Sequence, residues 1–236
     1  MSDDGIDGSA ISTPPEEASS LRMVATLGAA GALAGLLIVG VFTVTLPPIE
    51  AHKAEVLRLA ISEVLNGPAR YETLYATPQG IFESPPPAGA EKIYIGLDAN
   101  SVKTGVAIKA AAAGFQDVIT LIYGFDPATG RLLGIKVLES RETPGLGDKI
   151  EKEPHFIANF EKLEAALTAA GDALLHPIVT VKQGEKEEPW QIDGITGATI
   201  TSEAIGKILN DSANTWAPVL EREARIFASG ETTEEP

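Results

Sequence analysis

An uninterrupted apolar segment stands near the start of the chain. No charged residue occurs from Met23 to Leu46, and as an α-helix these positions would span roughly 36 Å, enough to cross a hydrocarbon core of about 30 Å. A cleaved signal peptide is the alternative, but its leader would be basic, whereas this leader is acidic apart from Arg22. The pattern favours a permanent transmembrane helix over residues 21–46, preceded by a disordered tail over residues 1–20.

The hydrophobic pattern changes at Pro47-Pro48, which we expect to end the membrane span. Pairs of apolar residues then recur every four positions from Ile49 to Leu65, which predicts an amphipathic helix. Residues 67–90 include three successive prolines and are expected to be irregular. Residues 47–90 would therefore be an amphipathic helix followed by an irregular connection.

Short apolar runs typical of β-strands fill the centre of the chain. Two of them are Tyr94–Leu97 and Val106–Ala110. The clearest pair is Asp117–Phe125 and Leu132–Leu138, which Asp126–Gly130 would join as a hairpin loop. The adjacency of these last two runs predicts antiparallel pairing.

The final third of the chain contains both helix-like and strand-like hydrophobic patterns. A helical pattern covers Ile157–Ala169, and short strands are expected near Ile178–Val181 and Trp190–Ile192. A last helix would run to about Trp216, where Pro218 interrupts it. Together these elements predict an α+β domain over residues 91–217, with a mainly antiparallel sheet and flanking helices, and an acidic tail over residues 218–236.

The composition excludes several classes of function. Acidic residues outnumber basic ones 33 to 18, and the net charge of −15 would repel nucleic acid. The chain has no cysteine, which excludes disulfides, cysteine-ligated iron–sulfur clusters and thioether-linked haem. Its three histidines are far apart and lack metal-ligand spacing. We therefore predict no metal site, and an electron carrier of this kind would need an organic cofactor.

A Gly- and Thr-rich stretch, Asp193-Gly-Ile-Thr-Gly-Ala-Thr-Ile-Thr-Ser202, precedes the last predicted helix. Its hydroxyls would lie at the first helical turn, where backbone N–H groups lack partners and the helix dipole attracts an anion. From the spacing alone, an ordinary hydroxyl-capped helix start is the favoured interpretation of the stretch.

A second motif, Glu142-Thr-Pro-Gly-Leu-Gly-Asp148, follows the predicted hairpin. Pro144 stiffens this loop, while Gly145 and Gly147 permit positive φ and expose backbone. It could be a simple strand-to-helix turn. The third glycine of a Gly-x-Gly-x-x-Gly fingerprint is missing, so a dinucleotide site of the Rossmann type is not supported.

Taken together, the two motifs resemble those of the FMN-binding domain family. This family includes the G-type subunit of the Rnf ion-translocating electron-transport complex and the C-type subunit of the sodium-pumping NADH:quinone reductase. Asp-x-x-Thr-Gly-Ala-Thr-x-Thr is similar to the family's covalent flavinylation motif, and Asp148-Lys-Ile150 after the other motif is typical of relatives of the Rnf G type. Many relatives have histidine where this chain has Ser140-Arg141. That difference bears on the redox tuning of the flavin rather than on its attachment.

The resemblance implies that Thr199 carries FMN through a phosphoester bond, and that the Glu142 motif lines the isoalloxazine ring. A separate flavin transferase would make this bond from FAD with a divalent metal, since no base stands beside Thr199 in the sequence. It implies no catalytic residue in this chain. The residues assigned to the cofactor site are Glu142, Thr143, Gly145, Leu146, Gly147, Thr196, Gly197, Ala198, Thr199 and Thr201.

The implied function is electron transfer within an Rnf-type complex that couples ferredoxin/NAD redox chemistry to ion translocation. The partners would be the other membrane subunits, the flavin transferase and membrane lipid. The resemblance also places the domain on the extracytoplasmic side of the cytoplasmic membrane, and the chain alone is not expected to turn over NADH. The alternatives are a component like the C-type subunit of the sodium pump, a membrane-anchored regulatory flavodomain and an unflavinylated scaffold.

Overall fold

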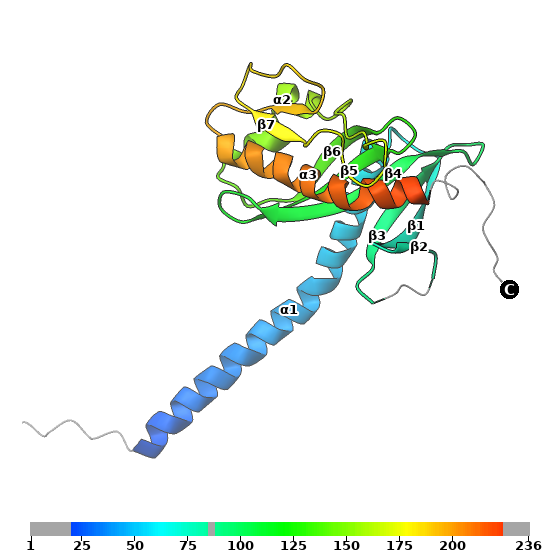
Figure 1. Ribbon diagram of the computed structural model, residues 1–236. Coiled ribbons are helices and arrows are strands. Elements are labelled where there is room, and N and C mark those ends of the chain that lie inside the picture. The colour runs from blue at the N-terminus through cyan, green and yellow to red at the C-terminus, as the bar shows by residue number, and fades with distance from the viewer. Residues whose placement is uncertain (1–19, 85–87, 224–236) are drawn as a thin grey trace, which may run out of the picture. The chain divides into compact units, whose positions relative to one another are not determined.

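The computed structural model describes residues 20–84 and 88–223 (Figure 1). The chain divides into two compact units, Met1–Lys53 and Ala54–Pro236. The expected N-terminal tail lies, except for Ser20, outside the described residues.

A single helix, α1, runs from Ser20 to Val64 and is long and apolar enough to cross a membrane. Its apolar side chains, among them Leu27, Leu36 and Ile38, are exposed, as contact with lipid would require. Pro47-Pro48, where we expected the membrane span to end, lie inside α1, and the predicted helix after them is a continuation of the same helix. Proline fixes φ near its helical value, so a helix can continue through it once the lost N–H bonds to the preceding turn are tolerated.

The second unit is built on a six-stranded antiparallel sheet of order β2-β1-β3-β4-β5-β6. The four strands predicted for the central part of the chain are confirmed as β3 to β6. The strands are β1 (Arg70–Thr77), β2 (Gly80–Phe82), β3 (Glu91–Leu97), β4 (Lys103–Ala113), β5 (Val118–Asp126) and β6 (Arg131–Glu139).

Two segments differ from their predictions. Residues 67–90 are not simply irregular, because they contain β1 and β2. The helix expected over Ile157–Ala169 is limited to α2, Pro154–Ala158. Beyond it, Glu164 N–H donates to Pro189 O and Ala165 N–H donates to Gly130 O. These long-range bonds replace the helical ones and keep the segment extended.

The remaining elements follow the second half of the chain. They are a short 3₁₀ helix η1 (Gly147–Glu151), the parallel strand pair β7 (Val179–Val181) and β8 (Gln191–Asp193), and helix α3 (Thr199–Arg222). Helix α3 does not stop near Trp216, since Pro218 lies within it. The rest of the expected acidic tail, from Ala224 on, lies outside the described residues.

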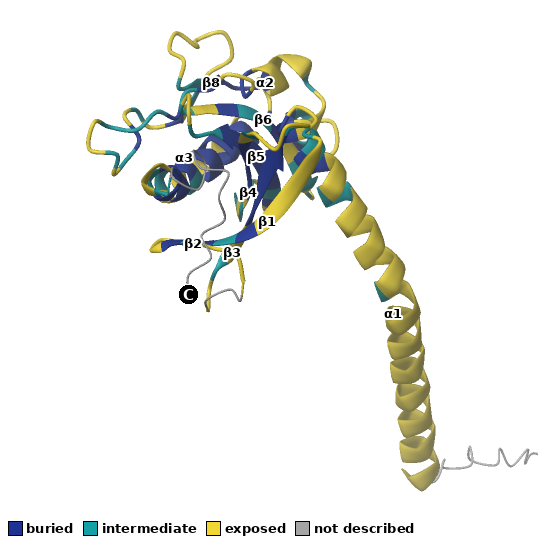
Figure 2. Ribbon diagram, turned by 90° about the vertical axis from the view of Figure 1, so that its right-hand side faces the viewer, coloured by how far each residue is buried: buried dark blue, intermediate teal, exposed yellow. Residues whose placement is uncertain are grey.

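The sheet is covered on both faces, as the alternation along β5 requires (Figure 2). Leu121, Tyr123 and Phe125 belong to the larger core, which includes the apolar stripe of α3. Ile122, from the intervening positions, packs instead with Ile61 and other residues at the end of α1. The Tyr123 hydroxyl also lies 3.0 Å from Ser212 Oγ on α3, and burial raises the pKa of Tyr123. Helix α3, which carries the Thr-rich motif at its start, is thus fixed on the sheet.

Gly124 lies on the face of the sheet that packs against the end of α1, and a substitution there tests this packing. A Cβ at this position would lie 2.0 Å from Val64 O, within the end of α1. We expect Gly124→Ala to lower the free energy of unfolding by about 1–3 kcal/mol, because the helix end must move off the sheet. Urea unfolding followed by circular dichroism measures the change. Gly80→Ala is the control, since its nearest neighbour would be 3.6 Å away. Equal midpoints for the two variants would contradict the close packing.

Candidate flavin site

The two sequence motifs meet in the folded domain. Thr201 Oγ1, in the first turn of α3, donates a 2.7 Å hydrogen bond to Glu142 Oε2. Both side chains are buried. Glu142 Oε1 accepts a second bond of 3.0 Å from Gln116 N–H, in the connection between β4 and β5. The buried carboxylate therefore joins three separate segments of the chain.

Gly147 makes this approach possible. A Cβ at Gly147 would lie 2.7 Å from both Cβ and Oε2 of Glu142 and 3.2 Å from Thr201 Oγ1. A side chain there would force the two motif loops apart. The bare backbone expected at Gly147 thus allows the two motifs to come into contact.

The loop of the Glu142 motif is a tight turn. Both Leu146 N–H and Gly147 N–H donate to Thr143 O, and Gly145 has φ +77°. Asp148 Oδ1 accepts a 2.7 Å bond from Gly145 N–H, while Lys152 Nζ donates to its other oxygen at 2.6 Å. The bond from Lys152 holds the pKa of Asp148 below its usual range. The turn leaves Leu146 49% exposed, so an apolar side chain projects from it.

Thr199 is the first residue of α3, and its side chain is exposed. Gly197, at φ +83°, turns the chain into the helix, and Ala198 occupies the N-cap without a side-chain hydrogen bond. The threonines of the motif are therefore not cap residues. Thr196 is also exposed, whereas Ala198 and Thr201 are buried.

Ser202 takes the role of internal support for the motif loop. Its Oγ donates to Ala198 O at 2.9 Å and accepts from Ile195 N–H at 3.2 Å. The residue is fully buried. The hydroxyls of this stretch thus serve different purposes, with Ser202 and Thr201 directed inward and Thr199 toward solvent.

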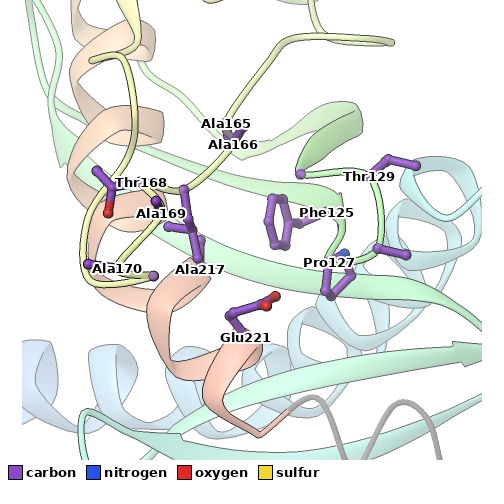
Figure 3. A pocket seen from close by; sticks show the side chains of 14 residues that line it. Phe125, Pro127, Thr129, Ala165, Ala166, Thr168, Ala169, Ala170, Ala217 and Glu221 are labelled. Atoms are coloured by element: carbon purple, nitrogen blue, oxygen red, sulfur yellow. The ribbon is translucent and has the colours of Figure 1, made fainter.

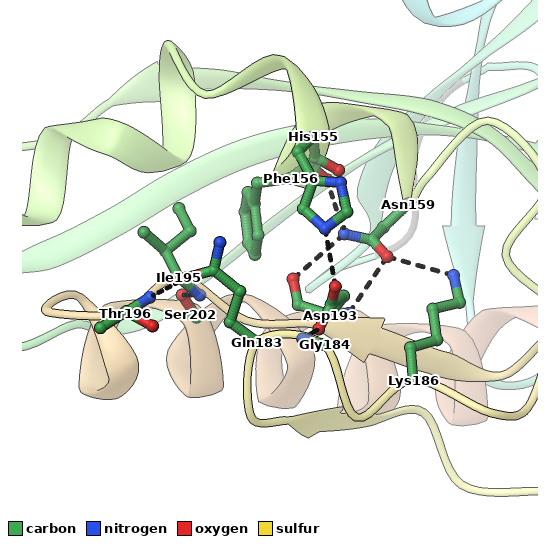
Figure 4. A network of polar contacts seen from close by, with 10 residues as sticks. All are labelled: His155, Phe156, Asn159, Gln183, Gly184, Lys186, Asp193, Ile195, Thr196 and Ser202. Atoms are coloured by element: carbon green, nitrogen blue, oxygen red, sulfur yellow. Dashed lines mark hydrogen bonds and ion pairs between the residues drawn. The ribbon is translucent and has the colours of Figure 1, made fainter.

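The start of the motif is held by a polar network that sequence reasoning missed (Figure 4). His155 Nε2 on α2 lies 2.6 Å from Asp193 Oδ2, and Gly184 N–H donates to Asp193 Oδ1 at 2.6 Å. The side-chain amide of Asn159 donates to Asp193 O and accepts from Asp193 N–H. His155 and Asp193 are 38 positions apart, so no local pattern in the sequence could have suggested the pair.

These residues fit an FMN group. The Thr199 hydroxyl is exposed at a helix N-terminus, where backbone N–H groups favour a phosphate. Open space lies beside Gly145 and Gly197, where an added Cβ would meet nothing within 4 Å. The exposed side chains of Leu146 and Ile200 supply apolar surface in the two motifs. The flavin, when bound, would supply the redox chemistry, and these residues would hold and orient it.

A cavity of about 410 Å³ lies elsewhere on the domain (Figure 3). Phe125, Pro127 and Ala217 line it together with the segment 165–171 and Glu221. Ala217 follows Thr199 by eighteen positions, or roughly 27 Å along α3. The cavity contains no residue of either motif, so it is separate from the candidate flavin site.

The bond between the motifs gives a stability prediction. Thr201→Val preserves shape but leaves Glu142 Oε2 without its donor, and we expect a loss of about 1–3 kcal/mol in the free energy of unfolding. Thr199→Val, two positions earlier, changes an exposed hydroxyl and should stay within about 0.5 kcal/mol of the parent. Urea denaturation of both variants compares them. A Thr201→Val protein as stable as Thr199→Val would show that the bond contributes nothing.

Acidification should release the turn at Asp148. Since the pKa of Asp148 is lowered in the folded state, its bonds contribute stability above the roughly 3.9 of a free aspartate and are lost as pH falls through the lowered value. The Gly145 amide resonance in NMR should follow this titration. Lys152→Met should move the midpoint upward, whereas Lys149→Met should have little effect. An unchanged midpoint in Lys152→Met would contradict the assigned cause.

Comparison with known proteins shows which proteins this chain resembles. Residues 114–214, which span both motifs, match the FMN-binding domain family. The G-type subunit of the ion-translocating oxidoreductase complex of Methanosarcina acetivorans is 26% identical over 193 residues, covering 82% of this chain and 92% of that protein. Its counterpart from Pasteurella multocida is 34% identical over 116 residues, covering 48% of this chain and about half (52%) of that protein.

Solved structures share the fold. NqrC of Shewanella oneidensis aligns with a TM-score of 0.60 at 14% identity, covering 76% of this chain and 100% of that one. The C-type subunit of the Na⁺-translocating NADH-quinone reductase from Parabacteroides distasonis gives 0.51 at 19% identity, with 68% and 79% covered. The α+β architecture expected from sequence is thereby confirmed. Residues 114–214 match the FMN-binding domain family, and the chain resembles the G-type subunits of ion-translocating oxidoreductase complexes.

Proposed function

We propose that this chain is an electron-transfer subunit of an Rnf-type membrane complex and carries FMN covalently on Thr199. The observation that carries the proposal is the meeting of the two motifs around Glu142 and Thr201, which leaves Thr199 exposed beside them. The FMN-binding domain and the similarity to G-type subunits of such complexes support the same assignment. The complex would couple ferredoxin/NAD redox chemistry to ion translocation.

The attachment would use Thr199 as a substrate rather than as a catalyst. Thr199 is exposed at the start of α3, and a threonine hydroxyl is a poor nucleophile unless a general base activates it. A separate flavin transferase would supply that activation. The Thr199 oxygen would gain a bond to the phosphorus of the FMN half of FAD, the pyrophosphate bond would break, and AMP and the hydroxyl proton would leave.

Covalent attachment suits an open site. Because Thr199 and Leu146 are both exposed, the site does not enclose a ligand and would hold a dissociable flavin weakly. A phosphoester bond removes that requirement and leaves part of the ring accessible to a partner. The phosphate charge near the start of α3 would gain about 0.3–1 kcal/mol from the helix dipole.

Helix α1 would anchor the domain to the cytoplasmic membrane by a single pass, with the domain on the extracytoplasmic side. The other subunits of the complex, the transferase and lipid around α1 would be its partners. A role like that of the C-type subunit in a sodium-pumping quinone reductase is the second candidate, favoured by the shared fold with NqrC. The Asp148-Lys-Ile150 continuation favours the Rnf G type, and Asp148 has a defined place in the turn.

Thr199→Val should abolish covalent flavin. Full-length protein produced with a flavin transferase would be denatured, separated by gel electrophoresis and examined for flavin fluorescence. Thr199→Ser should retain the signal, because it keeps the hydroxyl, and Thr196→Val is the matched control that should also retain it. Mass spectrometry of the peptide containing Thr199 should show the mass of FMN less one water. Fluorescence that persists in Thr199→Val would refute the assignment.

A further inference from the structure

Asp193 opens the flavinylation motif, yet its carboxylate is directed into the protein. Asp193 is 5% exposed, and each of its carboxylate oxygens has a partner at 2.6 Å, one on α2 and one on the turn after β7. Its backbone N–H and C=O are both bonded to the Asn159 amide. A flavin transferase that binds this loop could therefore not contact the Asp193 carboxylate directly. Asp193 therefore acts on the loop that follows it.

The residues that bind Asp193 are themselves held in place by packing in the core. Phe156, next to His155 on α2, is fully buried and packs edge-on against Phe160, with ring centroids 5.1 Å apart. Asn159, at the end of the same helix, is buried and accepts a further 3.1 Å bond from Lys186 Nζ. Helix α2 is therefore fixed in the core, while the His155 side chain remains 59% exposed.

The chain from Asp193 to Thr199 is held along its length. Gly194 passes so close to β7 that an added Cβ would lie 2.8 Å from Val181 O. Gln183 Oε1 then accepts Thr196 N–H at 3.0 Å, and Ser202 binds the loop at Ile195 and Ala198. Figure 4 shows these contacts converging on the loop from α2, from the β7–β8 turn and from α3. Within this set, His155 is the side-chain partner of Asp193 Oδ2, and its own side chain is 59% exposed.

We propose that His155 is a positioning residue for the flavin-acceptor loop, acting through Asp193 to hold Thr199 in the geometry that the transferase requires. This inference rests on the proposed function. Without the donor at His155, Asp193 Oδ2 is buried without a partner, which favours rearrangement of the loop. Misplacement of a reacting group by about 1 Å can reduce a rate by up to 100-fold. The loss should therefore appear in the rate of attachment at saturating transferase and FAD.

The test compares three full-length variants in detergent. His155→Phe removes the donor, His155→Gln keeps an N–H donor, and Ile157→Ala alters an exposed residue of the same helix as the control. With purified flavin transferase, FAD and Mg²⁺, we expect the saturating attachment rate to fall about tenfold or more in His155→Phe. His155→Gln should recover most of the rate, and Ile157→Ala should stay within about twofold of the parent.

A second measurement does not depend on flavin. Amide hydrogen exchange over residues 194–198 of the unmodified protein should speed up about tenfold in His155→Phe, with no change over the β4–β5 pair. Unchanged exchange in the loop would overturn the proposal, whatever happens at Thr199. Faster exchange with an unchanged attachment rate would overturn it equally, since the fixed loop would then serve no purpose in attachment. Loss of flavin from Thr199→Val tests the proposed function separately, so the two failures are distinguishable.

Discussion

The buried bond between Glu142 and Thr201 is the contact on which the site depends. A carboxylate removed from water is costly unless donors replace the lost hydration, and Glu142 finds its two donors on segments remote from its own loop. The loop after β6, the connection before β5 and the start of α3 must therefore all be in place before the carboxylate is satisfied. The candidate site is a product of tertiary folding, and neither motif could form it alone.

The spacing of the threonines explains how one helix turn serves both stability and chemistry. Successive residues of an α-helix are about 100° apart, so positions two residues apart face nearly opposite directions. Thr201 is buried against Glu142, and Thr199 is consequently directed to solvent. The same bond that packs Thr201 against Glu142 thus leaves Thr199, the proposed flavin acceptor, exposed. If the motif were shifted by one position along this turn, Thr199 would become buried or Thr201 would become exposed.

Local sequence signals predicted the parts of the fold whose partners are close in the chain. The strands around Val106 and Tyr123 are apolar runs joined by short turns, and both appear where expected. β1 was missed because its first half is exposed and polar, although Tyr71, Thr73 and Tyr75 alternate as in a strand. The helix expected beyond Ala158 is absent because backbone bonds to Gly130 and Pro189 take precedence over local propensity.

The same distinction applies to the site. Resemblance to a family could assign Thr199 and Glu142, because each belongs to a contiguous motif. It could not assign His155, whose partner is 38 positions away, or Gln116, whose only contribution to Glu142 is a backbone N–H. A contact made through backbone atoms does not depend on residue type, so the sequence does not indicate it. A pair of residues far apart in the chain cannot be recognised from a single sequence either.

The proposed flavin position lies at the surface of the described domain and not within its core. Among residues 20–84 and 88–223, every buried side-chain nitrogen or oxygen has a hydrogen-bond partner, and Gly197 and Thr199 stand outside the packed interior. A flavin attached at Thr199, as proposed, would therefore lie on the surface of the domain beside the two motifs. The contacts that fix residues 193–198 would then determine how the Thr199 hydroxyl is presented for attachment.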